Sequence, residues 1–253
     1  MAAAILIPIV TPTVMNTAMA IVIKAVTIMN SHILSLMLAG GTFPTGGFSQ
    51  SYGLETYVEK GIITNCIEFE EFLNSYALSI LAKSEGPYFC EAYRLTSECS
   101  FDKAAAINRE LTAMKLTREM RDSSHRTGKS FMRIASTIFD DSVLKDFYYG
   151  LKSEGINYSI AFSVTAARLN IGLQEALEDF FYTEVNNLVQ AALKLIPLGN
   201  VEAQSVLMRF IETIDNVVQT AIATDIEDVD NFSPGIEIAS IKHETLRTRL
   251  YMS

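Results

Sequence analysis

The sequence has little of what interrupts helices or ties a chain together covalently. Only 13 glycines, 6 prolines and 3 cysteines occur in 253 residues, and tryptophan is absent. The scarcity of glycine and proline permits long helices. Hydrophobic residues make up 49% of the chain and charged residues 19%. That balance is typical of a folded protein with a large core and argues against a disordered chain.

Cysteine and histidine lack the spacing of a disulfide framework or a metal site. The cysteines are Cys66, Cys90 and Cys99, and the histidines are His32, His125 and His243. No CxxC pair occurs, and an odd number of cysteines indicates a reducing compartment, so we expect a cytoplasmic protein. No two histidines stand four residues apart, and none pairs with a cysteine at ligand spacing. His243 is a weak candidate for a single metal ligand, and we expect no firmly bound cofactor.

Two classes of function lack their usual signals. The net charge is −9 and no run is rich in lysine and arginine, so we expect no nucleic-acid partner. The sequence contains no P-loop, no GxGxxG and no GxSxG. Paired carboxylates such as Glu70 and Glu71 are expected on helix surfaces, and the periodicity indicates no inward group of glutamates and histidines. We therefore predict a binding protein and not an enzyme.

The N-terminal stretch differs from the rest of the chain, because Lys24 is the only charged side chain between Met1 and Asn30. Residues 15–29 are apolar enough to suggest a membrane segment, but a spanning helix needs about 20 apolar residues. We expect residues 1–30 to be an atypical apolar extension packed on the domain or on a partner. Residues 31–253 are expected to form one helical domain.

Apolar residues recur at helical spacing through most of that domain. The sequence therefore predicts an all-α fold, a single-domain bundle of about nine to ten helices with no sheet. Residues 158–171 are apolar on nearly every face, which indicates a central helix. We expect Gly86-Pro87 to break one helix, Asp102 to cap another and Gly172 to end the central one.

Two polar or terminal stretches complete the expected pattern. Residues 118–129 form a polar band with charges of both signs, which usually marks a solvated helix face. The last helix is expected to begin at Ser233-Pro234 and to direct His243 and Leu250 inward.

One stretch, Phe43 to Glu55, departs from helical patterning. It reads Phe-Pro-Thr-Gly-Gly-Phe-Ser-Gln-Ser-Tyr-Gly-Leu-Glu. Pro44 fixes φ and has no N–H, while Gly46 and Gly47 permit positive φ. Between two helical runs this combination predicts a tight, defined bend. On composition alone, such a loop is most simply a connector between helices.

This stretch resembles a block found in urease accessory proteins of the UreF type. That family carries proline followed by two glycines, Phe-Ser, and then Ser-Tyr-Gly-Leu-Glu. The matching residues are Pro44, Gly46, Gly47, Phe48, Ser49, Ser51, Tyr52, Gly53, Leu54 and Glu55. The usual histidine of the block is Gln50 here, which weakens any metal role for the bend.

Two further stretches carry the resemblance, which spans roughly residues 34–253. Residues 118–129 are similar to an Arg-Glu…Arg…Ser…Gly-Arg/Lys run of the family. Residues 243–253 are very similar to its ending, His-Glu-x-Leu-x-x-Arg-Leu-aromatic-x-Ser. The expected central helix departs from the family at Ser159 and Ser163, where proline and glycine are usual.

The resemblance implies an all-helical, homodimeric protein that is not urease itself. Such proteins are chaperone-like and are needed for insertion of nickel into the urease active site. They bridge a UreG-like GTPase and a UreD/UreH-like scaffold protein on the urease apoprotein, and they control when GTP is hydrolysed. Nickel would be handled by the complex. The alternatives are a membrane-associated helical adaptor and, ranked last, an enzyme built on a helical bundle.

We expect a partner-binding site that joins the bend to the C-terminus. Arg249 is the first choice, because a guanidinium makes planar, bidentate contacts at interfaces, as an orienting anchor or as an arginine finger on a nucleotide. Phe48 and Tyr251 are expected to be apolar anchors beside it. The predicted site residues are Pro44, Gly46, Gly47, Phe48, Ser49, Ser51, Tyr52, Glu55, His243, Glu244, Arg247, Arg249, Leu250, Tyr251 and Ser253.

Overall fold

The computed structural model describes residues 31–41, 43–47, 50–229, 233–247 and 249–252. These residues form helices joined by turns, with no strand among them. The α-helices are α2 Leu54–Glu59, α3 Cys66–Tyr76, α4 Gly86–Ser97, α5 Phe101–Met114, α6 Arg118–Ile138, α7 Ser142–Leu151, α8 Tyr158–Arg168, α9 Leu173–Leu195, α10 Asn200–Ala223 and α11 Pro234–His243. Residues 31–39 are also helical, Ala77–Glu85 form the π-helix η2, and Ile226–Asp228 form the 3-10 helix η3.

The expected all-α, single-domain bundle of nine to ten helices is confirmed. The predicted extension at residues 1–30 lies outside the described part of the chain. Within that part, every helix is too short or too polar to cross a membrane.

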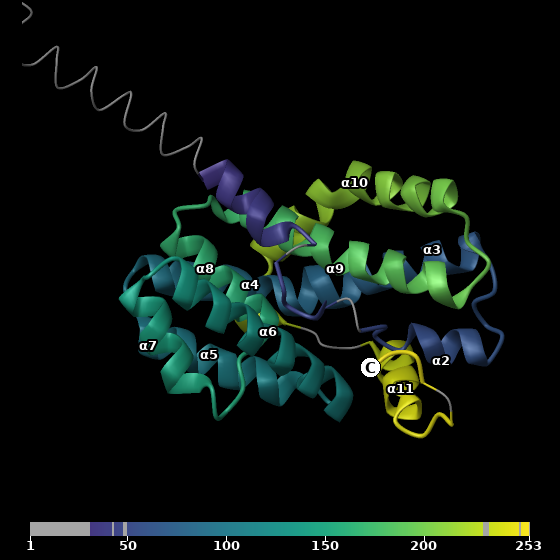
Figure 1. Ribbon diagram of the computed structural model, residues 1–253, viewed down its shortest axis with the longest axis horizontal. Coiled ribbons are helices and arrows are strands. Elements are labelled where there is room, and N and C mark those ends of the chain that lie inside the picture. Colours follow the sequence, from purple (N-terminus) through teal and green to yellow (C-terminus); the bar gives the residue numbers. More distant parts are fainter. Residues whose placement is uncertain (1–30, 42, 48–49, 230–232, 248, 253) are drawn as a thin grey trace, which may run out of the picture.

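The core is organised around α8, which packs against α4, α6 and α9 (Figure 1). Every residue from Tyr158 to Ala166 is buried. The ring of Phe162 lies 5.3 to 6.1 Å from the rings of Phe89, Phe131 and Phe180, one from each neighbouring helix. Aromatic pairs at these centroid distances pack favourably. The predicted central helix is therefore confirmed.

The expected break at Gly86-Pro87 is wrong. α3, η2 and α4 follow one another without a loop, and Gly86 has helical dihedral angles (φ −62°, ψ −50°). Pro87 follows directly on the π-helical turn, in which the N–H of Gly86 donates to the carbonyl of Leu81, five residues back. The change in hydrogen bonding falls instead in the π-helical stretch before it.

Two predicted helix ends are also wrong. Ser100 and not Asp102 precedes the first residue of α5, so Asp102 stands in the first turn. The turn after α8 uses Asn170, whose φ is 56°, and Gly172 is instead the residue before α9. Asparagine enters the left-handed region more readily than other residues with a side chain, which is why it can replace glycine there.

The C-terminal region agrees with the sequence at its start and differs at its end. α11 begins at Pro234 after Ser233, as expected, and His243 is buried. The helix ends at His243, however, so Leu250 lies beyond it and is 70% exposed, which contradicts the expected inward position.

Candidate functional site

The bend (residues 43–55) and the tail (residues 244–252) meet beside α2 and α11, where the C-terminus lies in Figure 1. Glu55, in the first turn of α2, joins them. Its Oε1 accepts a hydrogen bond from the backbone N–H of Leu250 at 2.7 Å, and its Oε2 accepts one from the N–H of Tyr251 at 3.1 Å. The tail is therefore bound through its main chain.

His243 lies between two carboxylates. Its Nε2 is 2.9 Å from Glu55 Oε2, and its Nδ1 is 2.7 Å from Oε2 of Glu119 on α6. All three side chains are buried. Both ring nitrogens can donate at once only when the ring is the imidazolium cation, which is then flanked by two negative charges. Both ring nitrogens are therefore occupied by carboxylate partners.

Arg249 completes what we call the tail cluster, the set Glu55, Glu119, His243 and Arg249. Its Nη1 donates to Glu119 Oε1 at 2.9 Å, while 43% of the side chain is exposed. A guanidinium has five N–H donors in a planar fork. The contact with Glu119 therefore orients the side chain and leaves donors that face solvent. Among the described residues, no group of three or more His, Cys, Asp or Glu side chains is placed to hold a metal ion.

The bend takes its direction from left-handed backbone. Gly46 and Gly53 have φ of 81° and 84°, which glycine adopts without strain. A Cβ at Gly53 would also lie 3.0 Å from Ala239 Cβ, so this glycine lets the bend approach α11 closely. Tyr52 has φ 49° although it carries a side chain, and its hydroxyl donates to Oε2 of Glu184 on α9 at 2.7 Å.

A second group, the core cluster, lies on the inner side of the bend and consists of the partly buried Tyr52 and the buried Tyr76, Tyr158 and Glu184. Tyr76 donates to the same carboxylate oxygen of Glu184 at 3.2 Å. Glu184 Oε1 and the Tyr158 hydroxyl are buried and have no hydrogen-bond partner in the described part of the chain. Burial raises the pKa of Glu184, against the hydrogen bonds from the two tyrosines. The core cluster and the buried ion pair of Lys115 with Glu85 line one small cavity of about 20 Å³.

The predicted site residues divide by exposure. The exposed ones are Pro44, Arg247, Arg249 and Leu250. The partly buried ones are Gly46, Tyr52 and Glu244. The buried ones are Gly47, Ser51, Glu55, His243 and Tyr251. Phe48, Ser49 and Ser253 lie outside the described residues. Only the exposed and partly buried residues can contact another molecule in this conformation, so the buried ones act on the site by fixing its shape.

Sequence reasoning missed Glu119 and Glu184. Glu119 falls in the polar band that we expected to be solvated, yet it is buried. The expectation of no inward group of glutamates and histidines is also wrong, because Glu55, Glu119 and His243 are buried together. Helical periodicity does not show which helices meet, so it could not predict this group. A signal for Glu184 did exist. It stands four residues after Phe180 and four before Leu188, in the middle of an apolar stripe.

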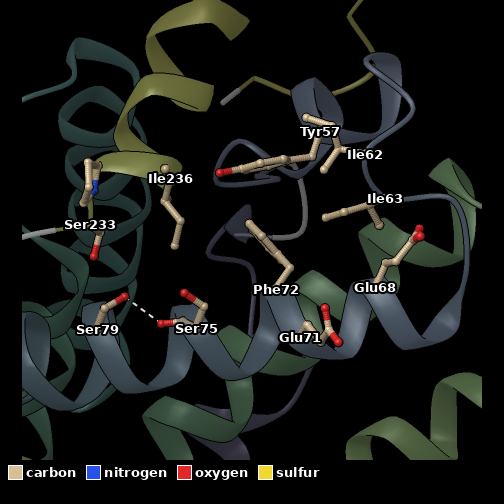
Figure 2. A pocket seen from close by; sticks show the side chains of 12 residues that line it. Tyr57, Ile62, Ile63, Glu68, Glu71, Phe72, Ser75, Ser79, Ser233 and Ile236 are labelled. Carbon is tan, nitrogen blue, oxygen red and sulfur yellow. Dashed lines mark hydrogen bonds between the residues drawn. The ribbon is translucent and has the colours of Figure 1, made fainter.

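A larger hollow of about 400 Å³ lies between α2, α3 and the start of α11, and Figure 2 shows its lining. Glu68 and Glu71 border it. Glu68 Oε2 accepts from the backbone N–H and the hydroxyl of Thr64 at 2.7 and 2.9 Å, and these hydrogen bonds lower the pKa of Glu68. Glu68 is therefore engaged at the start of α3.

The fold and the site define an all-α protein whose C-terminal tail is bound back onto a glycine-rich bend through buried charge. Comparison with known proteins gives the family. The UreF family model matches residues 63–211, more than half of the chain. The chain belongs to the UreF family.

Curated relatives cover more of the chain than the family model does. This chain is 31% identical over 232 residues to the urease accessory protein UreF of Lachnoclostridium phytofermentans. The matched region covers 89% of this chain and 100% of that protein. It is 28% identical over 220 residues to the UreF of Actinobacillus pleuropneumoniae, covering 86% and 97%. With the UreF of a Nostoc species the identity is 30% over 228 residues, covering 90% and 98%.

Proposed function

We propose that this chain is a urease accessory protein that acts by protein contact in the insertion of nickel into urease. It bridges a UreG-like GTPase and a UreD/UreH-like scaffold protein on the urease apoprotein, and it has no catalytic activity of its own. It works as a homodimer in the cytoplasm, and nickel passes through the complex and not to a firm site on this chain. Membership of the UreF family supports this role.

The observation that carries the proposed site is the joining of bend and tail by Glu55. It places the exposed Arg249 and Leu250 beside the start of α2, where the bend ends. A polar hollow of about 160 Å³ borders the tail and is lined in part by Gln50, Arg118 and Met252. A half-exposed arginine near a polar hollow is a feature that protein interfaces use, because arginine is among the residues that dominate binding energy.

Control of the GTPase follows from differential binding. If this surface binds one nucleotide state of the GTPase more tightly, the equilibrium shifts toward that state by the difference in affinity. The rigid attachment of the tail supports such selectivity, because a preformed surface loses less conformational freedom on binding than a mobile one.

The test replaces Arg249 with Ala and measures binding to the partner GTPase, with and without nucleotide, by size-exclusion chromatography and titration. We expect affinity to fall by a factor of about 30, the effect of losing an interface residue worth ~2 kcal/mol. Arg209→Ala is the matched control, because Arg209 is also about half exposed and pairs with one carboxylate, Glu70. Equal affinity of the wild type and the Arg249→Ala variant would remove Arg249 from the site, and absence of any complex with the wild type would refute the proposed function.

A further inference from the structure

One helix, α9, contacts the segment that leads into and through the bend at successive turns (Figure 1). Asp179 accepts a hydrogen bond from Ser35, and Thr183 donates one to the carbonyl of Ala39 at 3.4 Å. Residues 179 and 183 are four apart and therefore share one face of α9. α9 thus provides a polar edge along which the chain runs before it reaches α2.

The bend turns back along the same edge. A Cβ at Gly47 would lie 3.0 Å from Asn187 Nδ2, which places the middle of the bend beside the next turn of α9. Tyr52 then returns to Glu184, one turn earlier in α9. At its start the bend is bound to α6, since Ser130 donates to the carbonyl of Pro44 at 3.0 Å. The bend is therefore fixed at its start by α6 and at its end by Glu184.

Tyr52 is the point in the bend that needs outside support. Its φ of 49° lies in the left-handed region, which is unfavourable for a bulky residue with a Cβ. Such a conformation persists only where the surroundings impose it. The hydrogen bond to the buried Glu184 carboxylate is short, and an ionised acceptor makes it stronger than a neutral pair. The Tyr52 ring also packs on Tyr76, with centroids 5.2 Å apart.

We propose that Glu184 is the positioning residue of the bend. By accepting the Tyr52 hydroxyl inside the core, it keeps Tyr52 left-handed and sets the path of the neighbouring residues 50–53. Glu184 is itself buried, so it acts on a partner only through the shape of the bend. The effect on the bend is independent of the proposed function, and only the effect on partner affinity depends on it.

The test measures amide hydrogen exchange in the full chain. The amides of Gln50 and Leu54 are suitable reporters, because their hydrogen bonds to Gly47 and Ser51 lie on either side of Tyr52. Tyr52→Phe removes only the hydroxyl and keeps the ring. We expect both amides to exchange about tenfold faster in that variant, the effect of losing one hydrogen bond to a charged group. Glu184→Gln keeps an acceptor without charge and should give a smaller acceleration.

Two comparisons separate positioning from general stability. Tyr76→Phe removes the other donor to Glu184, which is not in the bend, and should leave the two amides unchanged. Amides of α8 should exchange at the wild-type rate in every variant. The double variant Tyr52→Phe/Glu184→Gln should exchange no faster than Tyr52→Phe alone, because both changes break one interaction. Unchanged exchange in Tyr52→Phe, or equal acceleration across α8 and the bend, overturns the proposal.

A binding measurement then links the bend to the partner. With the partner GTPase, Tyr52→Phe should lose affinity in proportion to the fraction of molecules that keep the native bend, which the same exchange data give. If the affinity does not follow the fraction of molecules that keep the native bend, Glu184 positions a bend that the partner does not use, and the link to binding is refuted. If the wild type binds no GTPase, the proposed function fails, while the exchange data still decide the role of Glu184.

Discussion

The bend is held by two buried glutamates, Glu55 in the tail cluster and Glu184 in the core cluster, and the two meet different partners. Glu55 accepts two backbone N–H groups and lies against His243, which also faces Glu119. Glu184 accepts two phenol hydroxyls through a single oxygen, and its other oxygen has no partner among the described residues. One carboxylate is fully engaged and the other only partly.

The difference indicates what each cluster can do. The tail cluster joins four stretches, α2, α6, the end of α11 and the tail, and N–H groups of the other stretches contact each of its two carboxylates. Removing one member leaves the others buried without their partners, which is strongly destabilising. In the core cluster, the neutral hydroxyls of Tyr52 and Tyr76 donate to Glu184, and Tyr52 is the residue with the strained backbone. Burial of the Glu184 carboxylate disfavours folding. Its role is therefore conformational more than stabilising.

The largest effect that can test this comparison is expected from Glu55→Ala. The change leaves His243 with one carboxylate and the N–H groups of Leu250 and Tyr251 without an acceptor. We expect the free energy of unfolding to fall by about 3–5 kcal/mol, as for other broken buried ion pairs. Chemical denaturation measures it. Glu70→Ala, which breaks the surface pair with Arg209, is the control and should cost at most about 1 kcal/mol.

Limited proteolysis gives a second measure of the same variant. Because Glu55 binds the tail main chain, its loss should let trypsin cleave after Arg247 and Arg249 much faster than in the wild type. A variant that unfolds at the wild-type denaturant concentration and keeps its tail resistant would show that Glu55 does not join the two stretches.

How far the sequence predicts this molecule is clear from particular residues. The apolar periodicity of α8 and α9 is enough to predict that these segments are helical, and the composition of the bend is enough to predict a turn. Both predictions succeed because such local structure depends on residues that are close in sequence. The tail motif marks His243 and Arg249 as site candidates, and the structure places both beside Glu119. What it cannot show is that Glu55 reaches the tail, or that Glu119 meets His243. These contacts join residues more than 120 positions apart, and only the packing of α2, α6 and α11 brings them together.

A smaller effect of opposite sign is expected in the core cluster from Tyr158→Phe. The Tyr158 hydroxyl is buried without a partner in the described residues, so removing it relieves an unpaired polar group and should stabilise the protein by about 1 kcal/mol. Tyr93→Phe is the matched control. Its hydroxyl donates to the carbonyl of Ile171 at 2.7 Å, and its loss should destabilise by about 1 kcal/mol. Thermal and urea unfolding of both variants provide the measurement, and loss of stability in both would mean that Tyr158 is satisfied after all.

The smallest expected effect is a change in how the free energy of unfolding varies with pH. This variation separates Glu184, whose charged form burial disfavours, from Glu70, which is well paired. Burial raises the pKa of Glu184 above its ordinary value of 4.5. Between 4.5 and the raised pKa the folded protein binds more protons than the unfolded chain, so this residue makes stability fall as pH rises. Glu184→Gln removes that fall, and the stability of the variant relative to wild type should increase with pH above 4.5.

Glu70 provides the opposite case, because its hydrogen bonds with Arg209 lower its pKa. Its contribution is present above 4.5 and is lost as pH decreases below that value, so Glu70→Gln should differ from wild type less at low pH than at neutral pH. Urea unfolding from pH 3 to pH 8 measures both curves, and a Glu184→Gln curve parallel to that of the wild type would show that this carboxylate titrates as it does in water.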